Sequence, residues 1–258
     1  NVFVIKEKKE LRDFIIRNDI TLQIARLANA RLKFKTRPLK LCYYGEVIRK
    51  KGSMLRPERQ FLQVGAECIG EKSYLADVEM LDLAYQALTI VGIKNISIDL
   101  SSSEFLSFLL KKIKLKKNRD KVTSFIKRKD FTNCLKYLDK SLHNYTNYLL
   151  SCTGNLEEKK EILKKLTLDH DTRVATEQLL AIYSNFKSKY PEVNFFLDLT
   201  ENNYLDYHTG TRFTFYAKNV RGEVARGGRY TLREDSKLES STGFTCYMDT
   251  IIRASSII

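Results

Sequence analysis

The chain has 258 residues, of which 43% are hydrophobic, and it carries a formal net charge of +14. This length is enough for one large domain, or for a domain with an insert, around a packed core. No apolar run approaches the roughly 20 residues that span a bilayer, and no secretory signal is visible at the start. The chain opens with Asn1 rather than Met, which predicts that the natural N-terminus is missing.

Five cysteines and three histidines are scattered along the chain without the spacing of a metal site. No Cys-x-x-Cys pair occurs, so neither a zinc site nor a disulfide framework is predicted. The odd number of cysteines and their wide spacing are typical of reduced thiols in the cytoplasm. A Gly-x-x-x-x-Gly-Lys-Ser/Thr phosphate loop is absent, and no histidine has the neighbourhood of a Ser/His/Asp triad. The sequence therefore predicts no metal and no cofactor.

The positive charge has two explanations. One is a polyanionic partner such as RNA or a nucleotide. The other is that lysines fill solvated helix faces, as in Lys111–Lys117 and Lys159–Lys165, where few aromatic residues lie between them. We favour the second explanation, so a nucleic-acid partner is not predicted.

Apolar periodicity and turn residues predict the secondary structure. A helix starts at Asp19 and Thr21, and a second helix is capped by Ser73 and ends near Gly92. Residues 103–188 are expected to be helical, and 243–254 to form a short amphipathic helix. The predicted strands are 2–5, 14–16, 39–49, 59–69, 95–100, 195–199, 207–217 and 224–230.

Strands near both ends and helices in the middle predict an α+β fold with an antiparallel sheet. We expect residues 1–100 and 193–258 to form one core domain, and 101–192 to be a lysine-rich helical insert. The strands 39–49 and 59–69 are expected to form a long antiparallel hairpin around a polar loop.

Three paired segments, in chain order, carry motif-like sequences: Arg17–Thr21 with Gln23–Arg26, Pro38–Arg49 with Arg59–Glu67, and Leu205–Phe213 with Gly227–Tyr230. They resemble, respectively, the amino-acid pocket entry, the motif 2 hairpin and the histidyl-specific segment of histidyl-tRNA synthetases. Three matches in one order are far more specific than one. The resemblance implies a class II aminoacyl-tRNA synthetase-like antiparallel sheet flanked by helices, with a helical insert.

The resemblance also identifies replaced groups. Arg49 stands at the place of the motif 2 arginine that binds the α-phosphate. Lys51 stands where an acidic residue is usual, Thr250 where motif 3 has an arginine over adenine, and Asn203 where an arginine meets the substrate carboxylate. Neither Thr nor Asn supplies the charge of a guanidinium. Adenylation and tRNA charging are therefore not expected, and the chain is not predicted to be an enzyme.

The sequence stops soon after motif 3, so an anticodon-binding domain is expected to be absent, and motif 1 lies outside it. This combination resembles the regulatory subunits of ATP phosphoribosyltransferase, which belong to histidine biosynthesis. The resemblance implies a short catalytic subunit as partner, a self-associating hetero-oligomer, and a part in activation and histidine feedback. The alternatives are a paralogue that activates an amino acid for another acceptor, and one that binds RNA.

The same resemblance implies a pocket like that for histidine. Two carboxylates are expected to form charge-assisted hydrogen bonds with an ammonium or imidazole group, with neutral hydrogen bonds from two further side chains and aromatic walls. The two carboxylates are those of Asp19 and Glu67, and the neutral hydrogen bonds come from Thr21 and Gln63. The aromatic walls are Tyr207 and His208.

Several of these residues also have structural explanations. Asp19 is equally suited to cap a helix, Glu67 to join a salt bridge, and Tyr207 to lie in the core. The segment Gly227–Arg229 is expected either to form a tight turn or to border the pocket.

Overall fold

A computed structural model of the chain describes residues 2–6, 13–52, 57–200, 208–234 and 237–255. It divides into two compact units, which we describe separately. The first unit comprises Asn1–Ile96, Thr214–Gly227 and Thr231–Ile258, and the second comprises Ser97–Phe213 and Gly228–Tyr230. None of the helices in the described part of the chain is long and apolar enough to cross a membrane.

The first unit is built on an antiparallel sheet. Strand β3 (Leu39–Ile48) pairs along its length with β4 (Gln60–Ile69), which confirms the predicted hairpin. The other neighbour of β4 is β10 (Lys237–Tyr247), also antiparallel. The order continues through β9 (Glu223–Glu234) to β8 (His208–Ala217), and these two strands contribute residues to both units.

Three helices pack on this sheet. Helix α1 (Thr21–Ala30) contacts β3 and β4, α2 (Tyr74–Ile90) contacts β4 and β10, and α9 (Met248–Ala254) contacts the same two strands. As predicted, the Ser73 hydroxyl caps α2 by accepting a hydrogen bond from the Leu75 N–H (3.2 Å). The residues that α2 buries include Met80, Leu81, Ala84 and Leu88.

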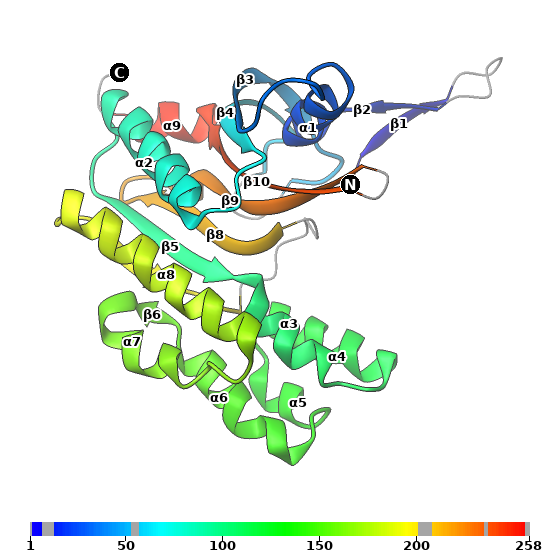
Figure 1. Cartoon of the computed structure of the whole chain (residues 1–258), viewed down its shortest axis with the longest axis vertical. Helices are drawn as coiled ribbons and strands as arrows, with labels where there is room; N and C mark the ends of the chain where they lie inside the picture. Colours follow the sequence, from blue (N-terminus) through cyan, green and yellow to red (C-terminus); the bar gives the residue numbers. More distant parts are fainter. Residues whose placement is uncertain (1, 7–12, 53–56, 201–207, 235–236, 256–258) are drawn as a thin grey trace. The chain divides into compact units, whose positions relative to one another are not determined.

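The first unit also carries a small two-stranded sheet. Strands β1 (Phe3–Lys6) and β2 (Asp13–Ile16) pair antiparallel, as predicted. Figure 1 shows this hairpin in blue, extending away from the rest of its unit.

The second unit is mainly helical (Figure 1, green to yellow). Its strand β5 (Ile96–Ser102) pairs parallel with β7 (Asn194–Leu197), whose other neighbour is the two-residue β6 (Gly154–Asn155). Apart from β6, the helical prediction for 103–188 is confirmed. Its helices are α3 (Ser103–Lys111), α4 (Lys116–Lys127), α5 (Phe131–Leu135), η1 (Lys140–Leu142), α6 (His143–Ser151), α7 (Leu156–Lys164) and α8 (His170–Lys189).

The α+β class is confirmed, but one local prediction was wrong. Residues 243–247 belong to β10, and only Met248–Ala254 form a helix. Residues 241–247 of β10 are nearly all buried, so this stretch lacks the alternation that marks a half-buried strand. The strand predicted over 224–230 is confirmed as part of β9, which excludes the tight-turn alternative for Gly227–Arg229. Gly228 has φ +151° there, which other residues rarely adopt, and a Cβ at this position would lie 2.6 Å from the Thr211 carbonyl oxygen.

Candidate functional site

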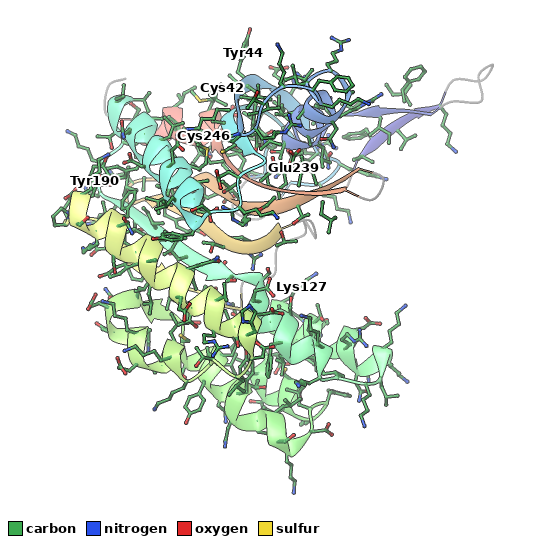
Figure 2. The ribbon with its side chains drawn as sticks, in the orientation of Figure 1. Cys42, Tyr44, Lys127, Tyr190, Glu239 and Cys246 are labelled. Carbon is green, nitrogen blue, oxygen red and sulfur yellow. The ribbon has the colours of Figure 1, made fainter. Side chains whose placement is uncertain are left out.

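One face of the β3–β4–β10 sheet collects the pocket residues predicted in the first unit. Alternate residues of a strand share a face, so Gln63, Gly65 and Glu67 of β4 lie together. Cys42 and Tyr44, labelled in Figure 2, belong to the other face of β3. The residues directly opposite β4 on this face are Gly45, Tyr43 and Leu41 of β3 and Tyr247, Thr245 and Gly243 of β10.

The first residues of α1 cover this face. Ile20 packs with Tyr43 and Tyr247 in one buried apolar cluster, and this packing sets the start of the helix over the strands. The Thr21 hydroxyl donates to Glu67 Oε1 at 2.8 Å, and both residues are buried. The helix start and β4 are thereby joined at two of the residues predicted for the pocket.

Asp19 has a structural role at the same helix start. Its Oδ1 accepts a hydrogen bond from the Thr21 N–H at 2.8 Å. The residue at the N-cap position is Ile20, which makes no side-chain cap, so Asp19 acts from one position earlier. The capping role is confirmed in this shifted form, and a role in ligand binding stays a prediction.

Tyr43 crosses β4 to reach β10. Its hydroxyl lies 2.5 Å from Thr245 Oγ1, although both residues are register partners of Gly65 on the strand between them. A Cβ on Gly65 would lie 2.5 Å from the Tyr43 hydroxyl oxygen and would overlap the Phe244 carbonyl oxygen. The absence of a side chain at Gly65 therefore allows the tyrosine to lie over the strand.

The absence of a side chain at Gly243 likewise leaves room for the Glu67 carboxylate. A Cβ at Gly243 would overlap Glu67 Oε2 and lie 2.6 Å from the Ala66 carbonyl oxygen. The carboxylate of Glu67 therefore occupies the space over Gly243, where Thr21 can donate to it. Gly65 and Gly243 thus leave the space that the side chains of Tyr43 and Glu67 occupy.

We expect Gly65→Ala to lower the free energy of unfolding by about 1–3 kcal/mol, the usual cost of overpacking. Gly45→Ala is the matched control. A Cβ there would meet the Arg17 guanidinium at 2.8 Å, the end of a flexible side chain that can move. Both changes remove the same backbone freedom from the unfolded chain, so their difference isolates the clash. Urea unfolding measures this difference in the free energy of unfolding. Equal losses of stability in the two variants would contradict the position of Tyr43 over Gly65.

Burial and charge determine the state of Tyr43. Burial, and then the negative charge of Glu67, raise the pKa of the Tyr43 hydroxyl well above its usual value. The hydroxyl therefore keeps its proton at neutral pH and remains a hydrogen-bond donor.

Gln63 presents an unused acceptor. Its side chain is 1% exposed, and its Oε1 has no hydrogen-bond partner among the described residues. A buried polar atom left without a partner costs about 1–3 kcal/mol. An N–H group of a ligand would remove that cost, and Glu67 on the same face suits a cationic group. The face is therefore suited to a small cationic molecule with N–H donors.

The motif 2 arginine lies at the end of β3. The Arg49 guanidinium is 4.9 Å from the centre of the Phe61 ring, and its Nε is 3.5 Å from the Asn18 carbonyl oxygen. Lys51 is exposed, whereas Thr250 on α9 is 1% exposed. Asn203 lies outside the described residues.

The structure thus brings Asp19, Thr21, Gln63 and Glu67 to one site. Tyr207 lies outside the described residues, and of His208 only the backbone, at the start of β8, is described. Our sequence analysis missed Tyr43 and Thr245. The available signal was that Tyr43 alternates with Gly45 on a predicted strand, whereas Thr245 was assigned to a helix. In the described ranges, no group of three His, Cys, Asp or Glu residues is arranged to hold a metal ion.

The sequence was compared with protein families and curated proteins. A family model described as histidyl-tRNA synthetase matches residues 1–251. A relative from Rhodospirillum centenum, named ATP phosphoribosyltransferase regulatory subunit, is 34% identical over 93% of this chain and 61% of its own length. A relative of the same name from Rhodospirillum rubrum is 34% identical over 92% and 62%. The chain spans about three fifths of the length of these relatives.

Solved structures show the same fold. An ATP phosphoribosyltransferase regulatory subunit/histidyl-tRNA synthetase from Bacillus halodurans has a TM-score of 0.80 at 23% identity, covering 99% of this chain and 68% of that one. A chain of the ATP phosphoribosyl transferase complex from Thermotoga maritima has a TM-score of 0.72 at 23% identity, covering 96% and 85%. Since the family match extends over nearly the whole sequence, this chain belongs to the histidyl-tRNA synthetase family.

Proposed function

We propose that this chain is a regulatory subunit of ATP phosphoribosyltransferase. It activates a short catalytic subunit in the first step of histidine biosynthesis and takes part in feedback by histidine. The observation that carries this proposal is the buried face of Gln63 and Glu67, joined to Thr21. This face keeps the polar groups for an amino acid, while Lys51 and Thr250 stand at places where the synthetases have catalytic side chains.

Histidine is the ligand that we propose for this face. Its ammonium or imidazolium group pairs with the Glu67 carboxylate, and a neighbouring N–H meets the free Gln63 Oε1. The Tyr43 hydroxyl, which keeps its proton, and the Asp19 carboxylate complete the polar surroundings. Asn203 in place of an arginine leaves the histidine carboxylate with a weaker partner, so binding is weaker than in a synthetase.

In this proposal the chain does not activate amino acids. Lys51 reverses the charge that faces the nucleotide, and Thr250 cannot stack a guanidinium on adenine. Weak binding is sufficient for regulation, because histidine has only to bias an equilibrium between active and inactive assemblies. Feedback requires that histidine bind the inhibited complex more tightly than the active one.

The partner and the location follow from the same proposal. Relatives at 34% identity are named regulatory subunits of this enzyme, which supports a short catalytic subunit as partner in a self-associating hetero-oligomer. None of the five cysteines, all of which lie in the described part of the chain, forms a disulfide, and four of them are buried, which supports a reducing compartment, the cytoplasm.

Co-elution tests the assembly. The purified chain and a short-form ATP phosphoribosyltransferase, mixed at micromolar concentration, are expected to leave a size-exclusion column as one complex. Separate elution would contradict the proposed partner. An RNA-binding paralogue would instead change its elution volume when RNA is added and not when the catalytic subunit is added.

A further inference from the structure

The positive charge of the chain is concentrated in the second unit. Residues 111–140 contain twelve Lys or Arg and three Asp, a net charge of +9 out of +14 for the whole chain. Eleven of the twelve cations are exposed. Lysines spread evenly over solvated helices do not explain this concentration, because the other 228 residues together carry only +5.

The cations in the middle of this surface lack carboxylate partners. Lys111 pairs with Asp171 and Lys129 with Asp198. By contrast, Lys114, Lys116 and Lys117 have no carboxylate within ion-pair distance in the part of the chain that the structure describes. Two of these lysines occupy the first turn of α4, where the helix dipole is also positive. This placement opposes the stability of α4 and presents a concentrated positive field to the solvent.

A cavity of about 190 Å³ lies within this positive surface. It is formed where the turn from α3 to α4 faces the turn η1, and its apolar walls are Ile113, Leu115 and Leu142. Leu115 is 66% exposed. The polar residues that line the cavity include Lys114, Asn118 and Asp139. A small hollow with both apolar and polar walls, inside a charged surface, suits an interaction site in which one anchor side chain fills the pocket.

We infer that residues 111–142 form a docking surface for an acidic protein segment that carries one apolar anchor side chain. The anchor enters the cavity beside Leu115, and acidic residues on either side of it face Lys114, Lys116 and Lys117. Asn118 and Asp139 accept or donate hydrogen bonds at the backbone of that segment. We assign this segment to the short catalytic subunit, so the assignment rests on the proposed function.

The aromatic residues of the surface favour a protein partner over a nucleic acid. Binding of single-stranded RNA uses exposed rings on which bases stack. Here three of the rings on or beside the surface already lie against one of its own cations. The pairs are Lys112 with Phe108 (5.2 Å), Lys121 with Tyr137 (4.4 Å) and Arg128 with Phe125 (5.3 Å).

A charge-reversal variant tests this surface. The triple variant Lys114→Glu, Lys116→Glu, Lys117→Glu is expected to weaken binding of the catalytic subunit at least about tenfold at low salt, because opposed charges become like charges. The wild-type affinity is expected to fall with ionic strength and that of the variant much less. Unfolding of α4 cannot account for the loss, because glutamates in the first turn of a helix are favourable. Calorimetry with the purified catalytic subunit measures both quantities.

Two further variants complete the test. Lys159→Glu, Lys164→Glu, Lys165→Glu makes the same charge change on and beside α7 and is expected to leave binding unchanged. Leu115→Asp removes an apolar wall but places a favoured residue at the N-cap of α4, so it is expected to weaken binding without loss of helix.

The outcomes distinguish a failure of the proposed docking surface from a failure of the proposed regulatory function. If the wild-type chain binds and the two triple variants weaken binding equally, the surface is wrong and the regulatory function stands. If the wild-type chain does not bind the catalytic subunit, both are contradicted. If the α4 triple variant loses polyuridylate RNA and keeps the protein complex, the surface serves a nucleic acid, and our assignment is wrong.

Discussion

Histidine-dependent exchange of pyrophosphate into ATP is expected to be at least about a thousandfold slower with this chain than with a catalytic histidyl-tRNA synthetase. Removal of one preorganised group that stabilises transition-state charge costs about two to three orders of magnitude in rate. In our proposal, Thr250 and Asn203 stand at the places of two cationic groups of the synthetases, and Lys51 at the place of an acidic one. Arg49 remains, but one arginine does not replace the others.

Two variants that put back synthetase-type residues serve as controls for this experiment. Thr250 is 1% exposed, so Thr250→Arg would bury a guanidinium without a partner and is expected to destabilise the fold instead of restoring exchange. Lys51 is exposed, and Lys51→Glu should therefore be tolerated and should still leave exchange near background. Exchange within about tenfold of a synthetase rate, measured with the wild-type chain, would show that the chain is an amino-acid-activating enzyme.

Replacement of Glu67 by Gln is expected to weaken histidine binding about ten- to hundredfold. A hydrogen bond to a charged group contributes about 1.5–3 kcal/mol, and each 1.4 kcal/mol is a factor of ten in affinity. The substitution keeps the shape of the side chain and an oxygen that can accept from Thr21. Calorimetry on the chain measures the binding. The histidine concentration that inhibits the complex should rise in parallel, because the two are linked.

Glu46→Gln is the matched control, because Glu46 lies on the other face of the same hairpin, where it is exposed and accepts from Gln60 at 3.0 Å. It removes the same charge without touching the proposed pocket and is expected to change neither measurement. If Glu67→Gln also changes neither, the face under α1 does not bind histidine, and the feedback site lies on the catalytic partner or at the interface.

The part of the site that lies on β4 was predictable because it depends on local alternation. Gln63 and Glu67 are four residues apart on one strand, so any strand assignment puts them on one face. The hydrogen bond between Tyr43 and Thr245 was not predictable. It requires the register between strands whose paired residues lie 202 positions apart in sequence, and register depends on contacts that no local pattern encodes.

The helix predicted for residues 243–247 was wrong because a local sequence pattern could not identify this strand. Of residues 243–247, all but Thr245 are buried, so their burial shows no alternation. A short apolar run of this kind cannot be distinguished from a buried helix by periodicity. The α1 start was predictable in its type, since Asp19 precedes a regular apolar spacing. The bond from Thr21 to Glu67 was visible only in three dimensions.

Phosphoribosyl transfer from phosphoribosyl pyrophosphate to ATP, assayed with a short-form catalytic subunit in the presence and absence of this chain, tests the central claim most directly. We expect the chain to raise the rate in a saturable manner, at a stoichiometry fixed by the complex, and histidine to reverse the increase. The α7 variant Lys159→Glu, Lys164→Glu, Lys165→Glu should activate as well as the wild type. A rate that stays the same at every concentration of the chain would contradict a regulatory function.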